Sequence, residues 1–427
     1  MPTVALQNLG CSKNLVDGDK IVYALRTAGF EVIDDFSEAE VIIVNTCSFI
    51  REAQEEAIES ILEGASFKTG GKCKTLVVSG CFSERYRGEI ATKFPEVDLW
   101  VGVNDWEQLL KERFSTSSEN TYERELQEPL STQYIKIAEG CSHGCTFCVI
   151  PNIRGQFNSR TIDSIVQEAL WLSEKGTKEL ILVAQDSSFY GRDINSSLQS
   201  LLEKLLKTTT FPWLRVMYLH PKYVDNSLLS LIASEKRICS YFDIPLQHIS
   251  DPILKAMNRP SSTADIYNLI DRIRTIVPDA AIRSAFILGF PGETDKHFKE
   301  LQKFVEFARF DKLGVFPYSP EEGTKAYSMK SRPRTSTAVS RCEELMLIQR
   351  EISREIMEAK IGSTIEVIVD RVSEDPDYNY EARSQFDAPE VDGKVLFTEG
   401  SLELGSIVPV QIIGCEDYDL YGKPVQP

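Results

Sequence analysis

Three cysteines within eight residues are the group of side chains best suited to chemistry. Cys141, Cys145 and Cys148 have the spacing C-x3-C-x2-C. Three thiolates on one tight loop can hold three corners of a 4Fe-4S cube and leave the fourth iron open to another molecule. A structural zinc site needs four ligands, usually from a second pair, and His143 is too close to Cys141 to complete it. Zinc and merely buried cysteines are the alternatives, although packing alone gives no reason for this spacing.

With Phe147 before the third cysteine, this run resembles the C-x3-C-x-aromatic-C motif of the radical S-adenosylmethionine superfamily. In that superfamily the open iron is chelated by the amino and carboxylate groups of S-adenosylmethionine. Electron transfer then yields methionine and a 5′-deoxyadenosyl radical, which abstracts hydrogen from an unactivated carbon. The resemblance implies a 4Fe-4S cluster on these cysteines, with Phe147 beside the cofactor.

Further cofactor contacts are expected where strands of the same domain end. The Gly-Phe-Pro-Gly segment from Gly289 to Gly292 is similar to the segment that such enzymes lay against the adenine, where glycine permits close backbone approach. A simple turn is the alternative interpretation. Other polar residues lie at the ends of predicted strands or within them, where we expect contact with the cofactor or the substrate. The alternative is that they are polar groups of the barrel mouth whose hydrogen bonds are made within the protein. They are Gln185 and Asp186, Gln247 and His248, and Arg283.

Alternating strands and helices must position these residues. From residue 134 onward, six apolar runs separated by helical patterns predict a partial or complete βα barrel of the TIM type, with its active site at the strand carboxyl ends. These runs are 134–138, 179–184, 215–219, 241–244, 281–288 and 312–316. Residues 336–360 form a long charged helical stretch that we expect to pack against the barrel.

The first hundred residues also alternate strands and helices, which predicts a parallel, flavodoxin-like α/β domain. The predicted strands are 3–9, 41–45, 75–79 and 97–103, and the predicted helices are 15–28, 49–62 and 83–93.

Cys11, Cys47 and Cys81 each follow one of the first three predicted strands. Because parallel strands end along one edge of a sheet, these thiols should converge. Any one of them alone would be interpreted as a small buried hydrophobe, but three at equivalent positions favour a shared metal site. The remaining cysteines are interpreted as packing residues: Cys73, Cys239, Cys342 and Cys415.

The last part of the chain changes to short alternating runs with turn signals between them, which predicts a small antiparallel, OB-like β-barrel. These runs are 364–372, 378–386, 394–398 and 407–413. The predicted domains are therefore 1–115, a linker at 116–133, the radical barrel with its trailing helix at 134–360, and the β-barrel at 361–427.

This order of domains resembles the radical-SAM methylthiotransferases, whose C-terminal β-barrel is of the TRAM type. The resemblance implies that Cys11, Cys47 and Cys81 hold a second 4Fe-4S cluster, again with one open iron. Sulfur would be carried there and methylated by one S-adenosylmethionine, while a second supplies the radical. The chemistry is centred on the clusters, so no catalytic acid or base is assigned.

Two branches of that family compete. The run Gly-Cys-Ser-Lys-Asn at 10–14 and the segment Asp-Ala-Pro-Glu-Val-Asp-Gly at 387–393 resemble the RimO type, whereas the transfer-RNA branch usually has Gly-Cys-Gln-Met-Asn. The resemblance implies methylthiolation of an aspartate β-carbon in the twelfth small-subunit ribosomal protein. The alternatives are modification of a transfer-RNA adenosine and, from another class, a non-catalytic iron–sulfur carrier.

The charge distribution agrees with a protein substrate. The chain has a net charge of −17, and residues 361–427 carry four basic against 14 acidic residues, a net charge of −10. Such a segment repels a nucleic-acid backbone and suits a basic partner, although a solvated face is the simpler reading. No apolar run approaches the roughly 18 residues of a membrane span and no signal peptide is evident, so we expect a cytoplasmic protein with reduced cysteines.

Overall fold

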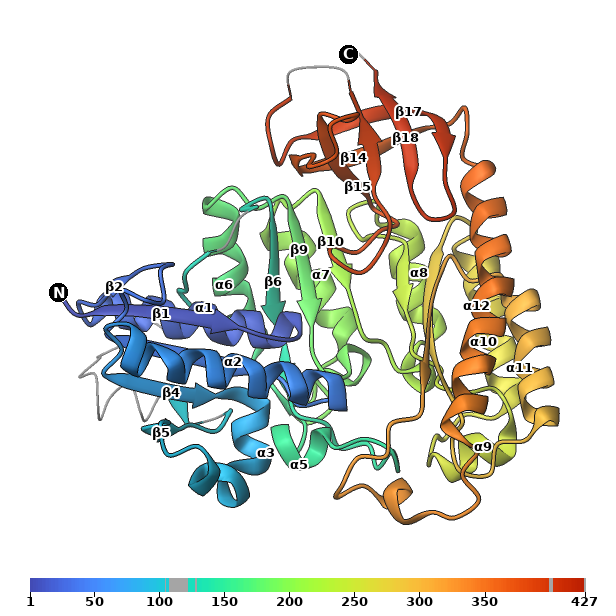
Figure 1. Cartoon of the computed structure of the whole chain (residues 1–427). Coiled ribbons are helices and arrows are strands. Elements are labelled where there is room, and N and C mark those ends of the chain that lie inside the picture. The colour runs from blue at the N-terminus through green and yellow to red at the C-terminus, as the bar shows by residue number, and fades with distance from the viewer. Residues whose placement is uncertain (104, 107–121, 127–128, 399–401, 426–427) are drawn as a thin grey trace.

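The computed structural model describes residues 1–427 except 104, 107–121, 127–128, 399–401 and 426–427. An α/β unit, an open barrel and a small β-barrel follow one another along the chain (Figure 1). Residues 116–121 and 127–128 of the expected linker lie outside the described residues. Among the helices of the described part, none combines the length and apolar character needed to cross a membrane.

The N-terminal unit is a parallel sheet in the order β2-β1-β3-β4-β5, the strand order of flavodoxin-like folds, so this prediction is confirmed. Its central strand is buried at every position because it is apolar and lies between helices on both faces. The elements are β1 (Thr3–Asn8), α1 (Ser12–Thr27), β2 (Glu31–Val32), β3 (Val41–Thr46), α2 (Arg51–Gly70), β4 (Thr75–Ser79), α3 (Gly80–Ile90) and β5 (Leu99–Trp100).

The central unit is a half-open parallel βα barrel in the order β6-β9-β10-β11-β12-β13. A backbone hydrogen bond from Leu219 N, just beyond β10, to Asp243 O of β11, 2.7 Å long, joins its two three-stranded halves. Its strands are β6 (Thr132–Lys136), β9 (Glu179–Val183), β10 (Trp213–Val216), β11 (Tyr241–Asp243), β12 (Ala281–Leu288) and β13 (Lys312–Pro317), with the short pair β7 (Ala138–Glu139) and β8 (Asn158–Ser159). Its helices are α5 (Ile150–Arg154), α6 (Ile162–Glu174), α7 (Leu198–Thr208), α8 (Asn226–Ser234), α9 (Asp251–Ala256), α10 (Thr263–Ile276), α11 (Asp295–Ala308) and α12 (Thr335–Glu358).

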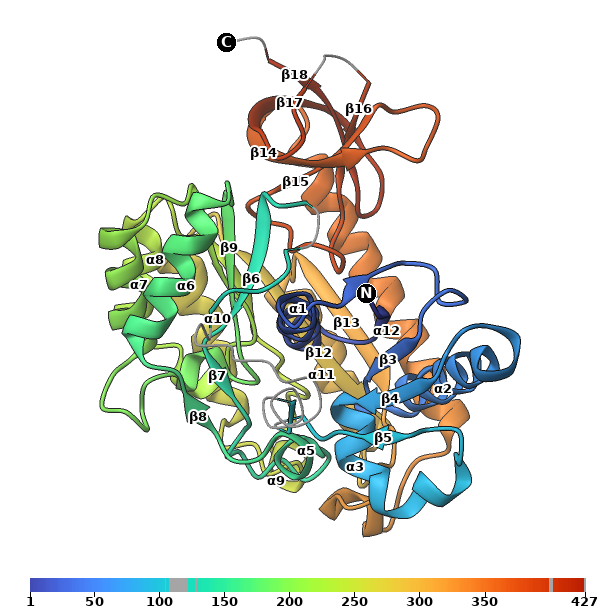
Figure 2. The same ribbon diagram turned by 90° about the vertical axis from the view of Figure 1, so that its left-hand side faces the viewer.

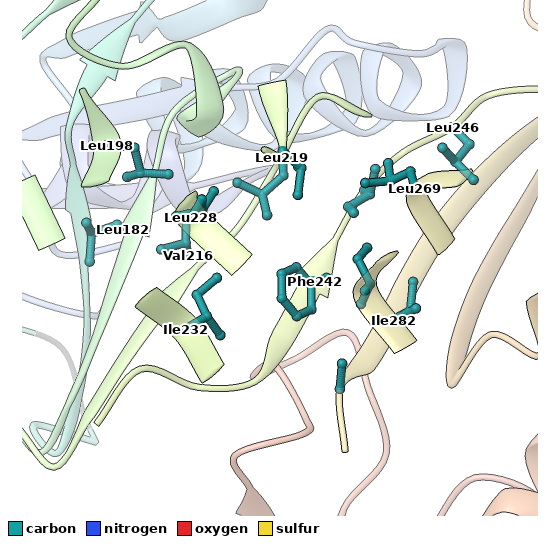
Figure 3. Close-up of a cluster of buried hydrophobic side chains, with 14 of the residues drawn as sticks. Leu182, Leu198, Val216, Leu219, Leu228, Ile232, Phe242, Leu246, Leu269 and Ile282 are labelled. Carbon is teal, nitrogen blue, oxygen red and sulfur yellow. The ribbon is translucent and has the colours of Figure 1, made fainter. Parts of the chain in front are cut away.

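The barrel core lies between the strands and the surrounding helices. Leu182, Val216, Phe242 and Ile282, one from each of four neighbouring strands, pack against leucines and isoleucines of the helices (Figure 3). Each such fully buried side chain contributes about 1.5–3 kcal/mol to folding. This rigid wall fixes the strand ends that carry the site.

Helix α1 of the N-terminal unit lies along the open side of the barrel, between β6 and β12–β13 (Figure 2). Val16 of α1 packs against Tyr134 of β6 and Tyr241 of β11. The first turn of α1, directly after Cys11, therefore faces the inside of the barrel rather than solvent.

The C-terminal unit is a closed barrel in the order β14-β15-β16-β18-β17. The expected purely antiparallel barrel is wrong in one respect, because β16 and β18 pair in parallel to close it. The sequence pattern also missed β18, which contains a glycine and a proline. The strands are β14 (Thr364–Val372), β15 (Tyr380–Ser384), β16 (Val395–Phe397), β17 (Ile407–Cys415) and β18 (Leu420–Pro424).

A segment of this unit, residues 385–392, closes the amino-terminal end of the central barrel. Asp387 pairs with Lys312 of β13 at 2.7 Å, and the Tyr241 hydroxyl donates to Asp392 at 2.6 Å. Arg215 of β10 donates to the Gln385 carbonyl at 2.9 Å. The acidic motif noted in the sequence is therefore an internal plug, and these two carboxylates are not available to a partner.

Candidate functional site

The first cysteine trio lies on the loop that leads from β7 into α5, as the motif predicts. Cys141 N donates to Gly155 O at 3.0 Å and Cys148 N donates to Cys145 O at 3.2 Å, which folds the loop back on itself. Gly140 has φ +74°, and a Cβ there would lie 2.2 Å from a backbone oxygen, so only glycine fits before Cys141.

The thiols of this loop suit a metal cluster. Burial raises the pKa of Cys141 to about 11 and that of Cys148 to about 12, so without a metal both thiols stay protonated. Arg259 Nη1 lies 3.9 Å from Cys145 Sγ and offsets negative charge on the loop. A bound iron–sulfur cluster provides the compensating charge that burial otherwise denies to thiolates.

The glycine segment after β12 adjoins this loop. Phe147 and Phe290 meet edge to face with ring centroids 6.4 Å apart. Gly289 and Gly292 have φ of +78° and +89°, which other residues rarely adopt. Gly289 N donates to Glu293 Oε2 at 2.8 Å, and this fixes the turn. The structure thus brings Phe147, Gly289 and Gly292 to one end of the barrel.

The polar candidates are less uniformly placed. Gln185 Nε2 donates to Glu139 Oε1 at 2.6 Å, close to the cysteine loop. Gln247 has φ +73° and forms a bridge to Phe286 of β12. His248 is fully buried 3.8 Å from Glu293, and burial lowers its pKa to about 3.

Arg283 lies near the start of β12, six residues before Gly289 and thus about 20 Å away along an extended strand. It pairs with Asp243 at 3.4 Å and with Asp392 of the plug at 3.5 Å. The structure therefore does not bring Arg283 to the Gly289 end of the barrel.

The second trio also converges. Cys11 precedes the first residue of α1, Cys47 follows β3, and Cys81 lies in the first turn of α3. A Cβ on Gly10 would lie 2.6 Å from Cys47 Cβ and 3.0 Å from its Sγ. A Cβ on Gly80 would lie 2.5 Å from the backbone oxygen of the residue before Cys47. The two Gly-Cys steps therefore pack closely around Cys47.

The charges around this trio favour thiolates at one position more than at the others. Burial acts to raise the pKa of Cys11, but Lys13 and Arg154 outweigh it and lower that pKa. Burial raises the pKa of Cys47 and raises that of Cys81 to about 11. Cys11 and Cys81 also lie at helix N-termini, where the helix dipole favours an anion.

The two trios lie on adjoining loops. Cys81 packs against Val149, which directly follows Cys148, and against Ile153 of α5. Arg154 Nη2 lies 3.4 Å from Cys81 Sγ and 3.1 Å from Asn14 Oδ1. The helix that directly follows the first cysteine loop, α5, thus contacts the second trio through Arg154.

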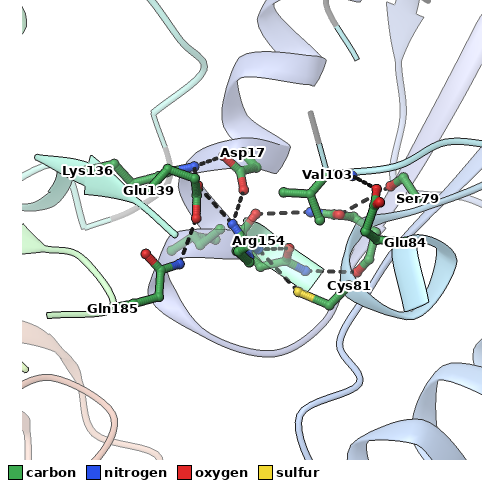
Figure 4. Close-up of polar contacts among 12 residues, drawn as sticks. Asp17, Ser79, Cys81, Glu84, Val103, Lys136, Glu139, Arg154 and Gln185 are labelled. Carbon is green, nitrogen blue, oxygen red and sulfur yellow. Dashed lines mark hydrogen bonds and ion pairs between the residues drawn. The ribbon is translucent and has the colours of Figure 1, made fainter. Parts of the chain in front are cut away.

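A charge network continues from Arg154 toward Gln185 (Figure 4). Arg154 Nη1 lies 3.0 Å from Asp17 and 3.1 Å from Glu139, and Lys136 Nζ lies 2.5 Å from each of the same two carboxylates. Burial acts to raise the pKa of Glu139, but Lys136 and Arg154 overcome it and lower the pKa to about 2. The network holds α1, β6 and α5 together beneath both trios.

Sequence reasoning missed Arg154, Lys136 and Glu139. The position of Arg154 six residues after Cys148 was the available signal. It also missed the stack of His143 on His220, with ring centroids 4.6 Å apart, and the 2.6 Å contact of His143 Nε2 with Asp186.

Two further features concern ligand sites. In the described parts of the chain, no three His, Cys, Asp or Glu side chains, those of the two trios included, are placed so that they could hold a metal ion. A cavity of about 1350 Å³ lies between the central and C-terminal barrels, at the amino-terminal strand ends. All six cysteines are described, and none of them lines that cavity.

Comparison with known proteins agrees with this architecture. Residues 3–102 match the model of the uncharacterized protein family UPF0004, residues 135–305 that of the radical SAM superfamily, and residues 361–425 that of the TRAM domain. Among solved structures, the radical S-adenosylmethionine methyltransferase TsrM from Kitasatospora setae has a TM-score of 0.56 at 15% identity, covering 85% of this chain and 79% of its own. OxsB, a cobalamin-dependent radical enzyme, has a TM-score of 0.51 at 13% identity, covering 81% and 56%. These two likenesses show the fold.

Fold and cysteine loop together define a radical S-adenosylmethionine enzyme. The ribosomal protein uS12 methylthiotransferase RimO of Clostridioides difficile is 43% identical over 99% of this chain and 98% of its own. The protein of the same name from Pelobacter propionicus is 41% identical over 98% and 97%. The chain belongs to the RimO family of ribosomal protein uS12 methylthiotransferases.

Proposed function

We propose that this protein transfers a methylthio group to the β-carbon of an aspartate in ribosomal protein uS12, with S-adenosylmethionine as both radical source and methyl donor. The proposal is supported most directly by the proximity of the two cysteine trios, since the segment 149–154 that follows Cys148 packs against Cys81 and its Arg154 contacts the Cys81 sulfur. Sulfur insertion at a carbon radical requires the sulfur source to be adjacent. The names of the relatives supply the substrate protein.

In this proposal Cys141, Cys145 and Cys148 hold one 4Fe-4S cluster, and Cys11, Cys47 and Cys81 hold the other. When bound, the first supplies the electron that cleaves S-adenosylmethionine to a 5′-deoxyadenosyl radical, and the second supplies sulfur.

The side chains around the trios orient these groups. Phe147 and Phe290 form an apolar wall beside the first trio, and the turn at Gly289 offers the backbone approach expected for the adenine. Gln185 is held by Glu139 at the end of β9. Helix α1 covers the open side of the barrel and limits the access of water to the radical.

A basic partner remains the expectation from charge, but fewer acidic residues are available for it than the sequence suggests. Asp370, Glu381, Asp387 and Asp392 are engaged in internal ion pairs. The acids that we propose to meet uS12 are exposed: Glu366, Glu374, Asp375, Asp377, Glu390, Glu403 and Glu416.

The test is anaerobic incubation of reconstituted enzyme with S-adenosylmethionine, a reductant, a sulfide source and purified uS12. We expect the aspartyl peptide to gain one methylthio group, as measured by mass spectrometry. Cys148→Ala should abolish both 5′-deoxyadenosine and product, whereas Cys47→Ala should abolish product alone. Cys73→Ala, a buried cysteine outside both trios, is the matched control. Modification of transfer RNA in place of uS12, or product from Cys47→Ala, would reject the proposal.

A further inference from the structure

Lys13 differs from the other buried cations of the molecule. Its side chain is only 8% exposed, and no carboxylate of the described residues lies within the 4.0 Å of an ion pair with its Nζ. In the described part of the chain, every other buried lysine or arginine contacts a carboxylate. Those are Arg124, Arg154, Arg215, Lys312, Arg341 and Arg383.

The unpaired ammonium lies where the second trio meets the barrel. Lys13 is two residues after Cys11, in the first turn of α1. Its Nζ lies 3.7 Å from the centre of the Tyr218 ring, just beyond the carboxyl end of β10. Substrates of βα barrels bind at this end of the strands. Cys11 and Tyr218, the neighbours of this ammonium, are only partly buried, so each keeps some surface that another molecule can reach.

The neighbouring carboxylates are already engaged. Glu139 pairs with Lys136 and Arg154. Asp243 Oδ2 accepts from Tyr218 N at 3.0 Å, and its Oδ1 faces Arg283 at 3.4 Å. Tyr218 has φ +62°, a conformation that its hydrogen bond to Asp243 helps to hold. The Tyr218 ring presents its face to Lys13. The charge of Lys13 acts on the neighbouring Cys11 thiol, but no carboxylate of the described residues pairs with it.

A buried ammonium without a counter-ion is costly, and a carboxylate ligand would remove that cost. An aspartate side chain carries its carboxylate one bond from the β-carbon. Pairing with Lys13 would therefore hold that carbon beside the cluster ligand Cys11. We propose that Lys13 binds the carboxylate of the substrate aspartate and makes the site specific for an acidic side chain. This inference rests on the proposed function.

Binding of uS12 to the cluster-loaded enzyme tests the inference directly. Dissociation constants are measured anaerobically by fluorescence anisotropy for labelled uS12 and for uS12 with its target aspartate changed to asparagine. We expect the wild-type enzyme to bind the aspartate form of uS12 at least about 30-fold more tightly than the asparagine form. This factor is the lower end of the range for losing one partner of a buried charge pair. Lys13→Met, which keeps the length of the side chain but not its charge, should bind both forms equally. Lys175→Met, an exposed lysine beside Trp171, is the control and should keep the preference.

Iron content and 5′-deoxyadenosine formation are measured in parallel. Equal binding of the two uS12 forms by wild-type enzyme refutes the inference, whether or not the variant folds. A preference that persists in Lys13→Met also refutes it, as does loss of iron from that variant, since Lys13 would then serve the cluster. If the wild-type enzyme modifies uS12 but shows no preference, only the inference about Lys13 fails. If it neither binds nor modifies uS12, the proposed function itself fails.

Discussion

Arg154 offers the sharpest test of how the two trios are coupled. Arg154 is 3% exposed, and its guanidinium contacts Asp17, Glu139 and the sulfur of Cys81. Arg154→Met keeps most of the side-chain volume but removes every one of these polar contacts. The expected result is a protein that is less stable and that loads its second cluster poorly.

The magnitude follows from the neighbours that remain. Breaking a buried ion pair by removing one partner costs about 3–5 kcal/mol. Lys136 still lies 2.5 Å from both Asp17 and Glu139, so we expect the lower end, about 3 kcal/mol. Loss of the guanidinium also removes a positive charge that lowers the pKa of Cys81, which burial already raises to about 11. Each further rise of one in the pKa of Cys81 disfavours its thiolate by about 1.4 kcal/mol, which is a tenfold loss in the thiolate population.

Two measurements test this reasoning. Iron per chain after anaerobic reconstitution should fall from about eight toward four, while 5′-deoxyadenosine formation persists. Urea unfolding of the metal-free protein, followed by circular dichroism, should show the loss of stability. Arg160→Met is the matched control, because Arg160 pairs with Glu168 at 2.6 Å and touches neither trio. Full iron loading in Arg154→Met, or an equal loss of iron in Arg160→Met, would refute the electrostatic argument.

Three other changes probe the supports of the site. Gly289→Ala places a Cβ 2.4 Å from a methyl group of α12, on a backbone with φ +78°. The free energy of unfolding, measured by urea titration, should fall by about 3 kcal/mol. Gly292→Ala, where the space is open, should lower it by only about 1 kcal/mol. Burial holds the pKa of His248 at about 3, below its ordinary 6.5, so the unfolded chain binds the extra proton. The free energy of unfolding should then fall by about 1.4 kcal/mol from pH 7.5 to 5.5. His248→Asn should remove this contribution to the pH dependence of stability. Asp387→Asn leaves Lys312 buried without its counter-ion, so proteolysis between α12 and β14 should accelerate roughly 100-fold, and an unchanged rate would show that the plug does not hold the domains together.

The six cysteines and the order of the domains could be predicted from the residues alone. Cys141, Cys145 and Cys148 are close in the chain, so their spacing alone defines a loop that can hold a cluster. The convergence of the second trio followed from a rule of topology, because parallel strands end along one edge. Alternation of apolar runs gave most strands of both α/β units, since buried parallel strands must be apolar.

Which charged side chains pair with one another depends on how distant segments pack, and this could not be predicted from the residues. Arg154 and Cys81, or Arg283 and Asp392, are far apart in sequence, and their contacts arise from how α5, α1 and the plug pack. Periodicity reports which face of an element is buried but not which element covers it. For the same reason, the sequence counted Asp387 and Asp392 in the acidic charge expected to suit a basic partner, whereas both pair inside the molecule. That Lys13 has no carboxylate partner can be recognised only when the ion pairs of the other buried lysines and arginines are known from the structure.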